Sequence, residues 1–257
     1  MAMKPISVQL YSLRERAAKD FAAVLKDVSD MGYVGVETAG LHGKTAGEVR
    51  RILDDLGLKC SSAHVKLPTR ETLGEAVDTA GALGYRHVIS GFGPAEFVSR
   101  EKIRAAAARF EEAAHLLKPH GLRMGYHNHW WEFDLVEGRY GYEWFLEACP
   151  SVFSQLDVYW ARNFGKVDTP AIVRKHARNL PLLHIKDGPL VKDQPHVAVG
   201  SGKADVASII QAADESVLEW IVVELDACAT DMTEAVRGSY AYLVKNGLAA
   251  GRKPVRT

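Results

Sequence analysis

Short apolar segments and longer amphipathic segments alternate along the whole chain, and the alternation occurs eight times. The short segments, several of them rich in β-branched residues, predict strands, and the amphipathic segments predict helices. The predicted strands are residues 6–11, 33–37, 59–65, 87–91, 123–128, 152–158, 182–186 and 220–225. The predicted helices are residues 21–31, 45–56, 70–83, 100–118, 141–148, 169–178, 206–214 and 233–246. Such strict alternation is typical of parallel strands joined by helical crossovers.

Eight strand–helix units favour a closed barrel over an open sheet. The 257 residues fit one (β/α)8 TIM barrel, which needs about 250 residues, and no linker divides the chain. An open dinucleotide-binding sheet would need a glycine-rich turn after the first strand, where this chain has Tyr-Ser-Leu-Arg at residues 11–14. Glycines 32, 57, 84 and 121 each follow a predicted helix, where a left-handed residue commonly ends it. The sequence therefore predicts a single α/β barrel domain over residues 1–257.

The charge balance excludes several classes of partner. Lys+Arg and Asp+Glu both number 32, so no net charge attracts the chain to nucleic acid or to an anionic membrane. The first residues lack the pattern of a secretory signal, and no apolar run is long enough to span a bilayer. The three cysteines have no disulfide or zinc-site spacing. We expect a cytoplasmic protein that acts on a small molecule, and a homo-oligomer remains open.

Carboxylate and imidazole side chains gather at the predicted C-terminal ends of the strands. Barrel active sites form at this end, from residues of several strands. The polar strand-end residues are Gln9, Glu37, His64, His127, His129, Glu132, Asp157, His184, Lys186, Asp187, Glu224 and Asp226. Several carboxylates at one place without a cation would be costly to bury. A mixed oxygen and nitrogen ligand set suits Mn²⁺, Mg²⁺, Co²⁺ or Zn²⁺, so the sequence predicts a divalent-metal site at this end.

Four segments carry a resemblance to a known family. They are residues 127–133 (HNHWWEF), 155–160 (QLDVYW), 184–187 (HIKD) and 223–226 (VELD). Together they resemble the sugar phosphate isomerase/epimerase family, which has a xylose isomerase-like TIM barrel and belongs with the apurinic endonuclease family 2 proteins. Residues 8–14, 32–37 and 62–64 are similar to the first three strands of that family, so the resemblance covers nearly the whole chain.

The resemblance implies a metal ion held by residues from strands five to eight. Asp157, His184 and Glu224 match three of its ligand positions. Many relatives place the fifth-strand glutamate where this chain has His127, and Glu132 follows five residues later. We therefore expect Glu132 as the fourth ligand, with His127 as the alternative. The expected ion is Mn²⁺, with Mg²⁺, Co²⁺ or Zn²⁺ as alternatives.

The resemblance also implies a reaction on a sugar. A metal beside a carbonyl acidifies the neighbouring C–H, so that a carboxylate can remove the proton and leave an enediolate. Relatives use two glutamates for this work, which points to Glu132 and Glu224, with His127 and Lys186 as further catalytic candidates. The substrate-binding candidates are Glu37, His64, His129 and Trp160. Return of the proton to the other carbon or to the opposite face would give a sugar isomerase or epimerase of carbohydrate metabolism.

Other functions remain as alternatives. Loss of a β-substituent at the same site would make the chain a keto-sugar dehydratase or lyase. An apurinic endonuclease of this fold needs additional histidines and a basic surface, whereas Gly91 ends the fourth strand and the net charge is zero. A non-catalytic sugar-binding barrel would not need the ligand set. Residues 200–203 (GSGK) follow the seventh strand, where barrels often bind phosphate, although a plain turn explains them equally well.

Overall fold

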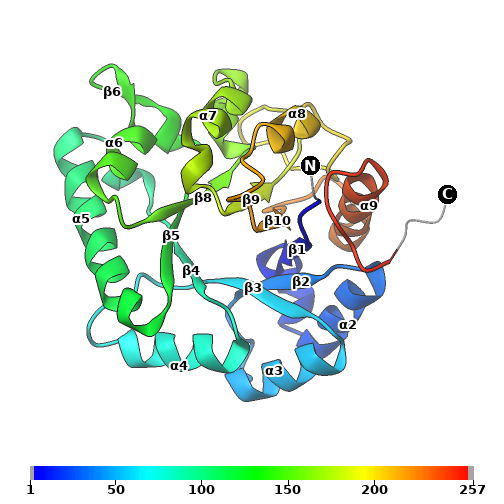
Figure 1. The fold of residues 1–257 in the computed structure, drawn as a ribbon. Coiled ribbons are helices and arrows are strands. Elements are labelled where there is room, and N and C mark those ends of the chain that lie inside the picture. Colours follow the sequence, from blue (N-terminus) through cyan, green and yellow to red (C-terminus); the bar gives the residue numbers. More distant parts are fainter. Residues whose placement is uncertain (1–2, 254–257) are drawn as a thin grey trace.

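Eight parallel strands close into a barrel in the computed structural model, which describes residues 3–253. Around the barrel the strands follow the order β1-β10-β9-β8-β5-β4-β3-β2, and Figure 1 shows the helices surrounding them. The strands are β1 (Ile6–Gln9), β2 (Gly35–Ala39), β3 (Lys59–His64), β4 (His87–Ser90), β5 (Arg123–His127), β8 (Phe153–Asp157), β9 (Leu182–Ile185) and β10 (Trp220–Val223). The predicted TIM barrel fold is confirmed.

One major helix follows each strand and packs an apolar face on the barrel. These helices are α2 (Phe21–Met31), α3 (Ala46–Asp55), α4 (Leu73–Leu83), α5 (Arg100–Leu117), α6 (Gly141–Ala148), α7 (Thr169–His176), α8 (Val206–Gln211) and α9 (Met232–Lys245). The short helix α1 (Arg14–Ala17) precedes α2. Phe110 and Leu117 on α5 are fully buried, as expected for residues on one face of an amphipathic helix. Among residues 3–253, no helix combines the length and apolar character needed to cross a bilayer.

Side-chain and glycine caps set the helix boundaries that the sequence predicted. Asp20 accepts a hydrogen bond from the backbone N–H of Ala23 at the start of α2, and Thr45 forms a capping box with Glu48 at the start of α3. Gly32 ends α2 with φ 105°, a left-handed conformation that residues with a Cβ rarely adopt. The predicted bounds of α2 therefore agree with the structure because its caps are local features, whereas α4 begins at Leu73 and α8 ends at Gln211, each three residues inside the predicted range.

Seven of the eight barrel strands end earlier than predicted, β2 ends two residues later, at Ala39, and one hairpin was not predicted. The first strand stops at Gln9, because its side-chain oxygen accepts from the N–H of Tyr11 and begins a 3₁₀ turn. Strands β6 (Leu135–Val136) and β7 (Arg139–Tyr140) form an antiparallel hairpin outside the barrel. Two-residue strands are too short to show alternating hydrophobicity, which explains why the sequence did not reveal this hairpin.

Arg252 connects the end of the described chain to helices near its start. Its Nε donates to the carbonyl of Tyr33 at 2.7 Å, and Nη1 donates to the carbonyls of Leu56 and Gly57, each at 2.8 Å. Its Nη2 donates to the hydroxyl of Ser29 at 2.8 Å. These acceptors lie at the C-terminal ends of α2 and α3, where helix carbonyl groups lack partners within the helix. The guanidinium therefore satisfies both helix ends.

Candidate metal centre and active site

A pocket of about 480 Å³ opens at the C-terminal ends of the strands. Its polar lining residues are His64, His127, His129, Glu224 and Asp226. Its aromatic lining residues are Tyr11, Phe92 and Trp131. The barrel thus brings strand-end residues that are far apart in sequence to one cavity, as the sequence predicted.

Four buried side chains converge beside this pocket. His127, Asp157, His184 and Glu224 each offer one ligand atom, and these atoms all lie within 4.8 Å of one another. The residues come from β5, β8, β9 and the end of β10, which are neighbours in the barrel. The side chain of Asn128 helps to place Asp157, because its Oδ1 accepts from the Asp157 N–H at 2.9 Å. One cation with ligand bonds of about 2.0–2.4 Å could contact atoms at this spacing.

Glu132 lies outside this group of four. It belongs to a 3₁₀ turn, Trp131–Phe133, and its side chain is fully buried. Its Oε1 accepts from the hydroxyl of Tyr126 at 2.6 Å, and its Oε2 accepts from the N–H of His129 at 2.9 Å. Burial raises the pKa of Glu132 to about 8. Of the two residues that the sequence offered as fourth ligand, the structure therefore brings His127, and not Glu132, to the other three.

Glu37 lies at the end of β2 and is surrounded by hydrogen-bond donors. It accepts from Nε2 of Gln9 at 2.6 Å and from Nε2 of Gln155 at 2.5 Å, and Nε2 of His184 lies 2.7 Å away. Burial favours the neutral carboxyl, but the imidazoles of His64 and His184 hold the pKa of Glu37 well below its usual range. The carboxylate is therefore ionised and fixed, and it does not line the pocket.

His184 lies between two carboxylates. Its Nδ1 lies 2.9 Å from Oε2 of Glu224, while Nε2 faces Glu37. Burial disfavours the imidazolium, but the charges of Glu37 and Glu224 outweigh this effect and raise the pKa of His184 to about 10. Without a metal ion, the ring therefore carries protons on both nitrogens, and a metal at either nitrogen would replace one of them.

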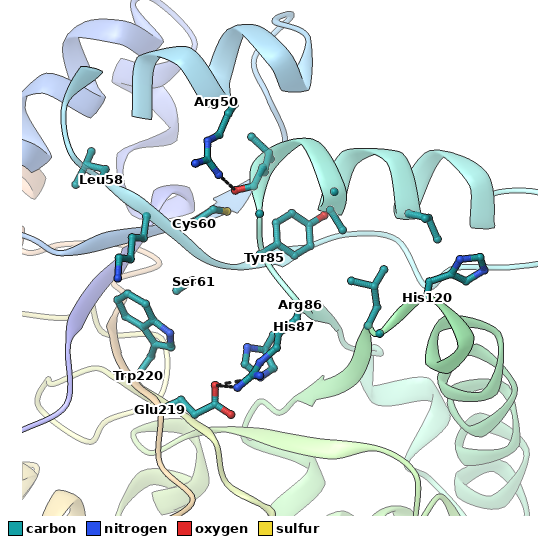
Figure 2. A pocket seen from close by; sticks show the side chains of 18 of the residues that line it. Arg50, Leu58, Cys60, Ser61, Tyr85, Arg86, His87, His120, Glu219 and Trp220 are labelled. Atoms are coloured by element: carbon teal, nitrogen blue, oxygen red, sulfur yellow. Dashed lines mark hydrogen bonds and ion pairs between the residues drawn. The ribbon is translucent and has the colours of Figure 1, made fainter. Parts of the chain in front are cut away.

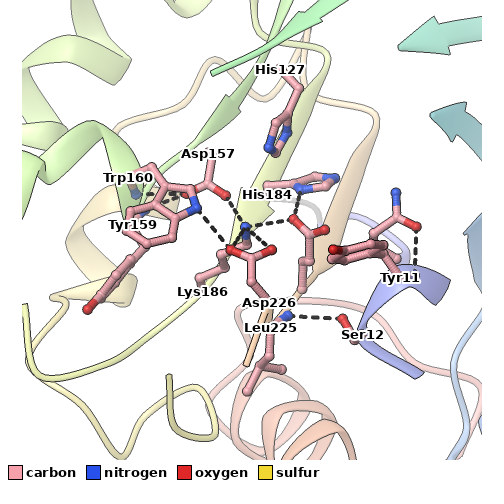
Figure 3. Close-up of polar contacts among 12 residues, drawn as sticks. Tyr11, Ser12, His127, Asp157, Tyr159, Trp160, His184, Lys186, Leu225 and Asp226 are labelled. Atoms are coloured by element: carbon pink, nitrogen blue, oxygen red, sulfur yellow. Dashed lines mark hydrogen bonds and ion pairs between the residues drawn. The ribbon is translucent and has the colours of Figure 1, made fainter. Parts of the chain in front are cut away.

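Lys186 forms ion pairs with three carboxylates of the site. Its Nζ lies 3.0 Å from Oδ2 of Asp157, 2.8 Å from Oε2 of Glu224 and 2.9 Å from Oδ2 of Asp226, and Figure 3 shows it between Asp157 and Asp226. Burial disfavours the ammonium, but the three carboxylates raise the pKa of Lys186 well above its usual value. Nε1 of Trp160 donates to Oδ2 of Asp226 at 3.1 Å. Trp160 therefore holds an acidic side chain of the pocket.

Two histidines of the pocket, His64 and His127, contact the side chain of Gln155. Nε2 of His64 lies 2.7 Å from Oε1 of Gln155, and Nδ1 of His127 lies 3.2 Å from the same oxygen. Burial lowers the pKa of His127 well below its usual value, and the neighbouring His184 and His64 lower it further. Burial and the nearby charge of Lys186 lower the pKa of His129 to about 4. His127 and His129 are therefore neutral near pH 7.

Sequence reasoning left some residues of this site without a role. Gln155 links Glu37 to the two histidines, and Gln9 donates to Glu37, yet neither amide forms part of a ligand pattern. Asp226 lines the pocket and contacts Lys186. Its position two residues after Glu224, at the end of a strand, was the sequence signal that could have indicated a place in the site. The inward positions of buried strands, where a glutamine is unusual, would have pointed to Gln155.

The GSGK segment after β9 forms a closed turn around Asp187. The Asp187 carboxylate accepts from the backbone N–H groups of Gly188 at 2.8 Å, Gly200 at 2.9 Å, Gly202 at 3.0 Å and Ala204 at 2.9 Å. Asp187 is fully buried. These amides therefore bind a carboxylate of the same chain, as expected for the plain turn and not for a phosphate site.

A larger cavity lies at the opposite end of the barrel. It has a volume of about 940 Å³, and Figure 2 shows His87, Glu219 and Trp220 among its lining residues. These residues stand at or next to the starts of β4 and β10, and Arg86 pairs with Glu219 at 2.7 Å. Residues at this face of a barrel usually serve stability. Within residues 3–253, both groups with metal-binding geometry lie at the other end.

Comparison with known proteins supports the same fold over nearly the whole chain. The profile of the xylose isomerase-like TIM barrel family matches residues 25–243. A sugar phosphate isomerase/epimerase from Parabacteroides distasonis shares 26% identity and a TM-score of 0.80, over 98% of this chain and 96% of that chain. An L-ribulose 3-epimerase shares 18% identity and a TM-score of 0.72, over 96% of this chain and 95% of that chain. The IOLI protein, whose structure contains a zinc atom, shares 14% identity and a TM-score of 0.75, over 96% and 98% of the two chains. No curated protein matches the sequence.

Proposed function

Because this chain belongs to the xylose isomerase-like TIM barrel family, we propose that it is a divalent-metal-dependent sugar isomerase or epimerase. The observation that carries the proposal is the group formed by His127, Asp157, His184 and Glu224, whose ligand atoms lie within 4.8 Å of one another beside an open pocket. The similarity to a sugar phosphate isomerase/epimerase supports a substrate with a sugar skeleton.

The donor atoms of this group fit a divalent cation. Oδ1 of Asp157 accepts two backbone N–H groups, those of Tyr159 at 3.0 Å and Trp160 at 2.8 Å. Within residues 3–253 its buried Oδ2 accepts no well-directed hydrogen bond, and the ammonium of Lys186 lies 3.0 Å from it. Two imidazoles and two carboxylates suit Mn²⁺, Co²⁺ or Zn²⁺ better than Mg²⁺, which prefers oxygen ligands and water. We keep Mn²⁺ as the first choice. A cation held there would polarise a substrate carbonyl and stabilise negative charge on adjacent oxygens.

We assign proton removal from the substrate carbon to Glu224. It is the carboxylate of the four-residue group that lines the pocket, whereas Glu37 and Glu132 are fully buried and absent from the lining. Lys186, at 2.8 Å, and His184, at 2.9 Å, hold the Glu224 carboxylate in place. Burial opposes ionisation of Glu224, but these two groups hold its pKa well below the usual range, so the side chain is a carboxylate without a proton of its own.

We assign return of the proton to His64. This residue ends β3, three strands away from β10 around the barrel, and its ring lines the pocket. Its Nε2 is fixed by Gln155 at 2.7 Å, which orients the ring. A base and an acid on different sides of one pocket allow the proton to return to another carbon or to the other face of the same carbon. The first outcome is isomerisation and the second is epimerisation.

The test combines metal binding with hydrogen exchange at carbon. Metal-free protein is reloaded with Mn²⁺, and aldoses and ketoses are followed by NMR in deuterated water, where loss of a C–H signal reports proton removal even when turnover is slow. We expect one cation per chain, and exchange next to the carbonyl only in the loaded protein. Stoichiometric metal without exchange on any pentose or hexose would contradict the proposed function, and so would exchange that does not depend on the metal.

A further inference from the structure

We infer that the pocket accepts an uncharged sugar and excludes the corresponding phosphate ester. The inference rests on the proposed function and adds the substrate class. Of the described residues that line the pocket, none is a lysine or an arginine, and two are the acids Glu224 and Asp226. Phosphate sites in proteins supply cationic side chains or free backbone N–H groups. A phosphate dianion would find no cationic side chain on this lining.

Two cations that contact lining residues, Lys186 and Arg14, already have partners. Lys186 is 1% exposed and is shared among Asp157, Glu224 and Asp226. Arg14 donates from Nη1 to the carbonyl of Tyr11 and from Nη2 to the carbonyl of Asp226, each at 2.9 Å. Its guanidinium also lies 4.1 Å from the centre of the Tyr11 ring. Binding of a phosphate by either side chain would break existing contacts.

The glycine-rich turn is closed to phosphate as well. The N–H groups of Gly200 and Gly202 that could bind an anion already donate to the Asp187 carboxylate. A Cβ at Gly202 would collide with Oδ1 of Asp187, which shows how closely the turn surrounds this side chain. The carboxylate of Asp187 therefore occupies the place in this turn that a bound anion would take.

The groups that do line the pocket suit a sugar without charge. Tyr11, which is 44% exposed, lies in the lining with Phe92 and Trp131, and aromatic faces pack well against the C–H face of a sugar ring.

Matched pairs of sugars test this inference. The Mn²⁺-loaded protein is given D-fructose, D-tagatose and L-ribulose, each beside its terminal phosphate ester, and carbon-bound hydrogen exchange and ligand-observed saturation transfer are both recorded. We expect the uncharged member to bind, and to exchange with a kcat/KM at least about tenfold higher than that of its ester, because the ester lacks a charged partner. Equal or tighter binding of the esters, or binding of neither member, overturns the inference. Selective binding of the uncharged sugars without exchange upholds it and contradicts the proposed function alone.

A variant that adds a cation provides an independent check. Gly93 lines the pocket, has an extended backbone with φ −79°, and a Cβ there would meet no atom within 4 Å. Gly93→Lys should therefore fold, and it should strengthen binding of the phosphate esters about tenfold relative to Gly93→Gln, the matched neutral control. Uncharged sugars should bind both variants alike. Ester binding that is equally weak in both variants would show that a missing cation is not the cause, and would overturn the inference.

Discussion

Nε2 of His184 lies 2.7 Å from Oε1 of Glu37, although their strands β9 and β2 stand three positions apart around the barrel. The contact crosses the end of the barrel and gives the imidazole a fixed orientation. Histidines that bind metals commonly donate their second ring N–H to a carboxylate, which orients the ring and strengthens it as a ligand. Glu37 is the residue placed to do this for His184.

Replacing Glu37 with glutamine should weaken metal binding by about 10–100-fold without removing a ligand, since loss of such an outer carboxylate has this effect in other metal sites. Competition with a fluorescent chelator measures the affinity for Mn²⁺ or Zn²⁺. Glu75→Gln, on the exposed surface of α4, is the control. An affinity for Glu37→Gln equal to that of this control would mean that Glu37 does not act through His184.

Metal content should distinguish the two candidates for the fourth ligand. His127 belongs to the group of four, and Glu132 is turned to Tyr126 and the N–H of His129. His127→Leu should therefore lower the bound metal well below one ion per chain, whereas Glu132→Gln should keep it. Metal analysis after gel filtration measures both variants. The reverse result would return Glu132 to the position that the sequence first suggested.

Glu224→Gln should lower the rate of carbon-bound hydrogen exchange by about 10²–10⁴, the usual contribution of a general base. The amide keeps the shape of the side chain but cannot accept the proton, and Lys186 keeps Asp157 and Asp226 as partners. The rate is compared with metal bound to saturation, so that weaker binding does not mimic loss of the base. Exchange at a wild-type rate under those conditions would rule out Glu224 as the base.

The stability of the protein should depend on pH through Glu132. Burial raises its pKa from an ordinary value of 4.5 to about 8, so between these values the folded state holds a proton that the unfolded state has lost. The free energy of unfolding should therefore fall as the pH rises through this range. Glu132→Gln, which resembles the protonated side chain, should remove this part of the slope. Urea unfolding at pH 5, 7 and 9 tests it, and parallel pH profiles for the two proteins would contradict it.

Asp187→Asn should loosen the turn over residues 198–204 while leaving the barrel folded. The carboxylate accepts four backbone N–H groups, and an amide has only one oxygen with which to accept them. Hydrogen exchange of the Gly200 and Gly202 amides should become much faster, and the melting temperature should fall. Asp205→Asn is a suitable comparison, because Asp205 accepts the N–H of Ser208 as a helix cap and makes no hydrogen bond to Gly200 or Gly202. Unchanged protection of the two glycine amides would refute the role of Asp187.

The eightfold architecture could be predicted because each unit carries its own local signals. Apolar strands, amphipathic helices and glycine caps such as Gly32 follow from neighbouring residues alone. The strand ends were harder to predict from the sequence, since the turn after β1 depends on where the side chain of Gln9 points. Local pattern cannot show this direction.

Some residues of the candidate site could likewise be predicted from the sequence, and others could not. Asp157, His184 and Glu224 could be placed together because adjacent parallel strands bring their ends together, and the structure does so. The choice between His127 and Glu132 could not be made from spacing, because it depends on how the 3₁₀ turn after β5 is held by Tyr126. The contacts of Gln155 could not be predicted for a related reason, since its hydrogen bond to Glu37 joins residues 118 positions apart.

The contacts of Arg252 have a consequence for the order in which the protein is finished during synthesis. Its guanidinium donates to carbonyls at the ends of α2 and α3. The last of these acceptors in the chain is Gly57, and most of the barrel is synthesised between Gly57 and Arg252. At synthesis rates of about 5–20 residues per second, the two helices leave the ribosome roughly ten seconds or more before this partner exists. During that interval the carbonyls of Tyr33 and Gly57 lack this donor, whereas the carbonyl of Leu56 can already accept from the hydroxyl of Ser29, at 3.1 Å in the finished structure. The ends of α2 and α3 therefore reach their full native hydrogen bonding only when the last residues of the described chain arrive.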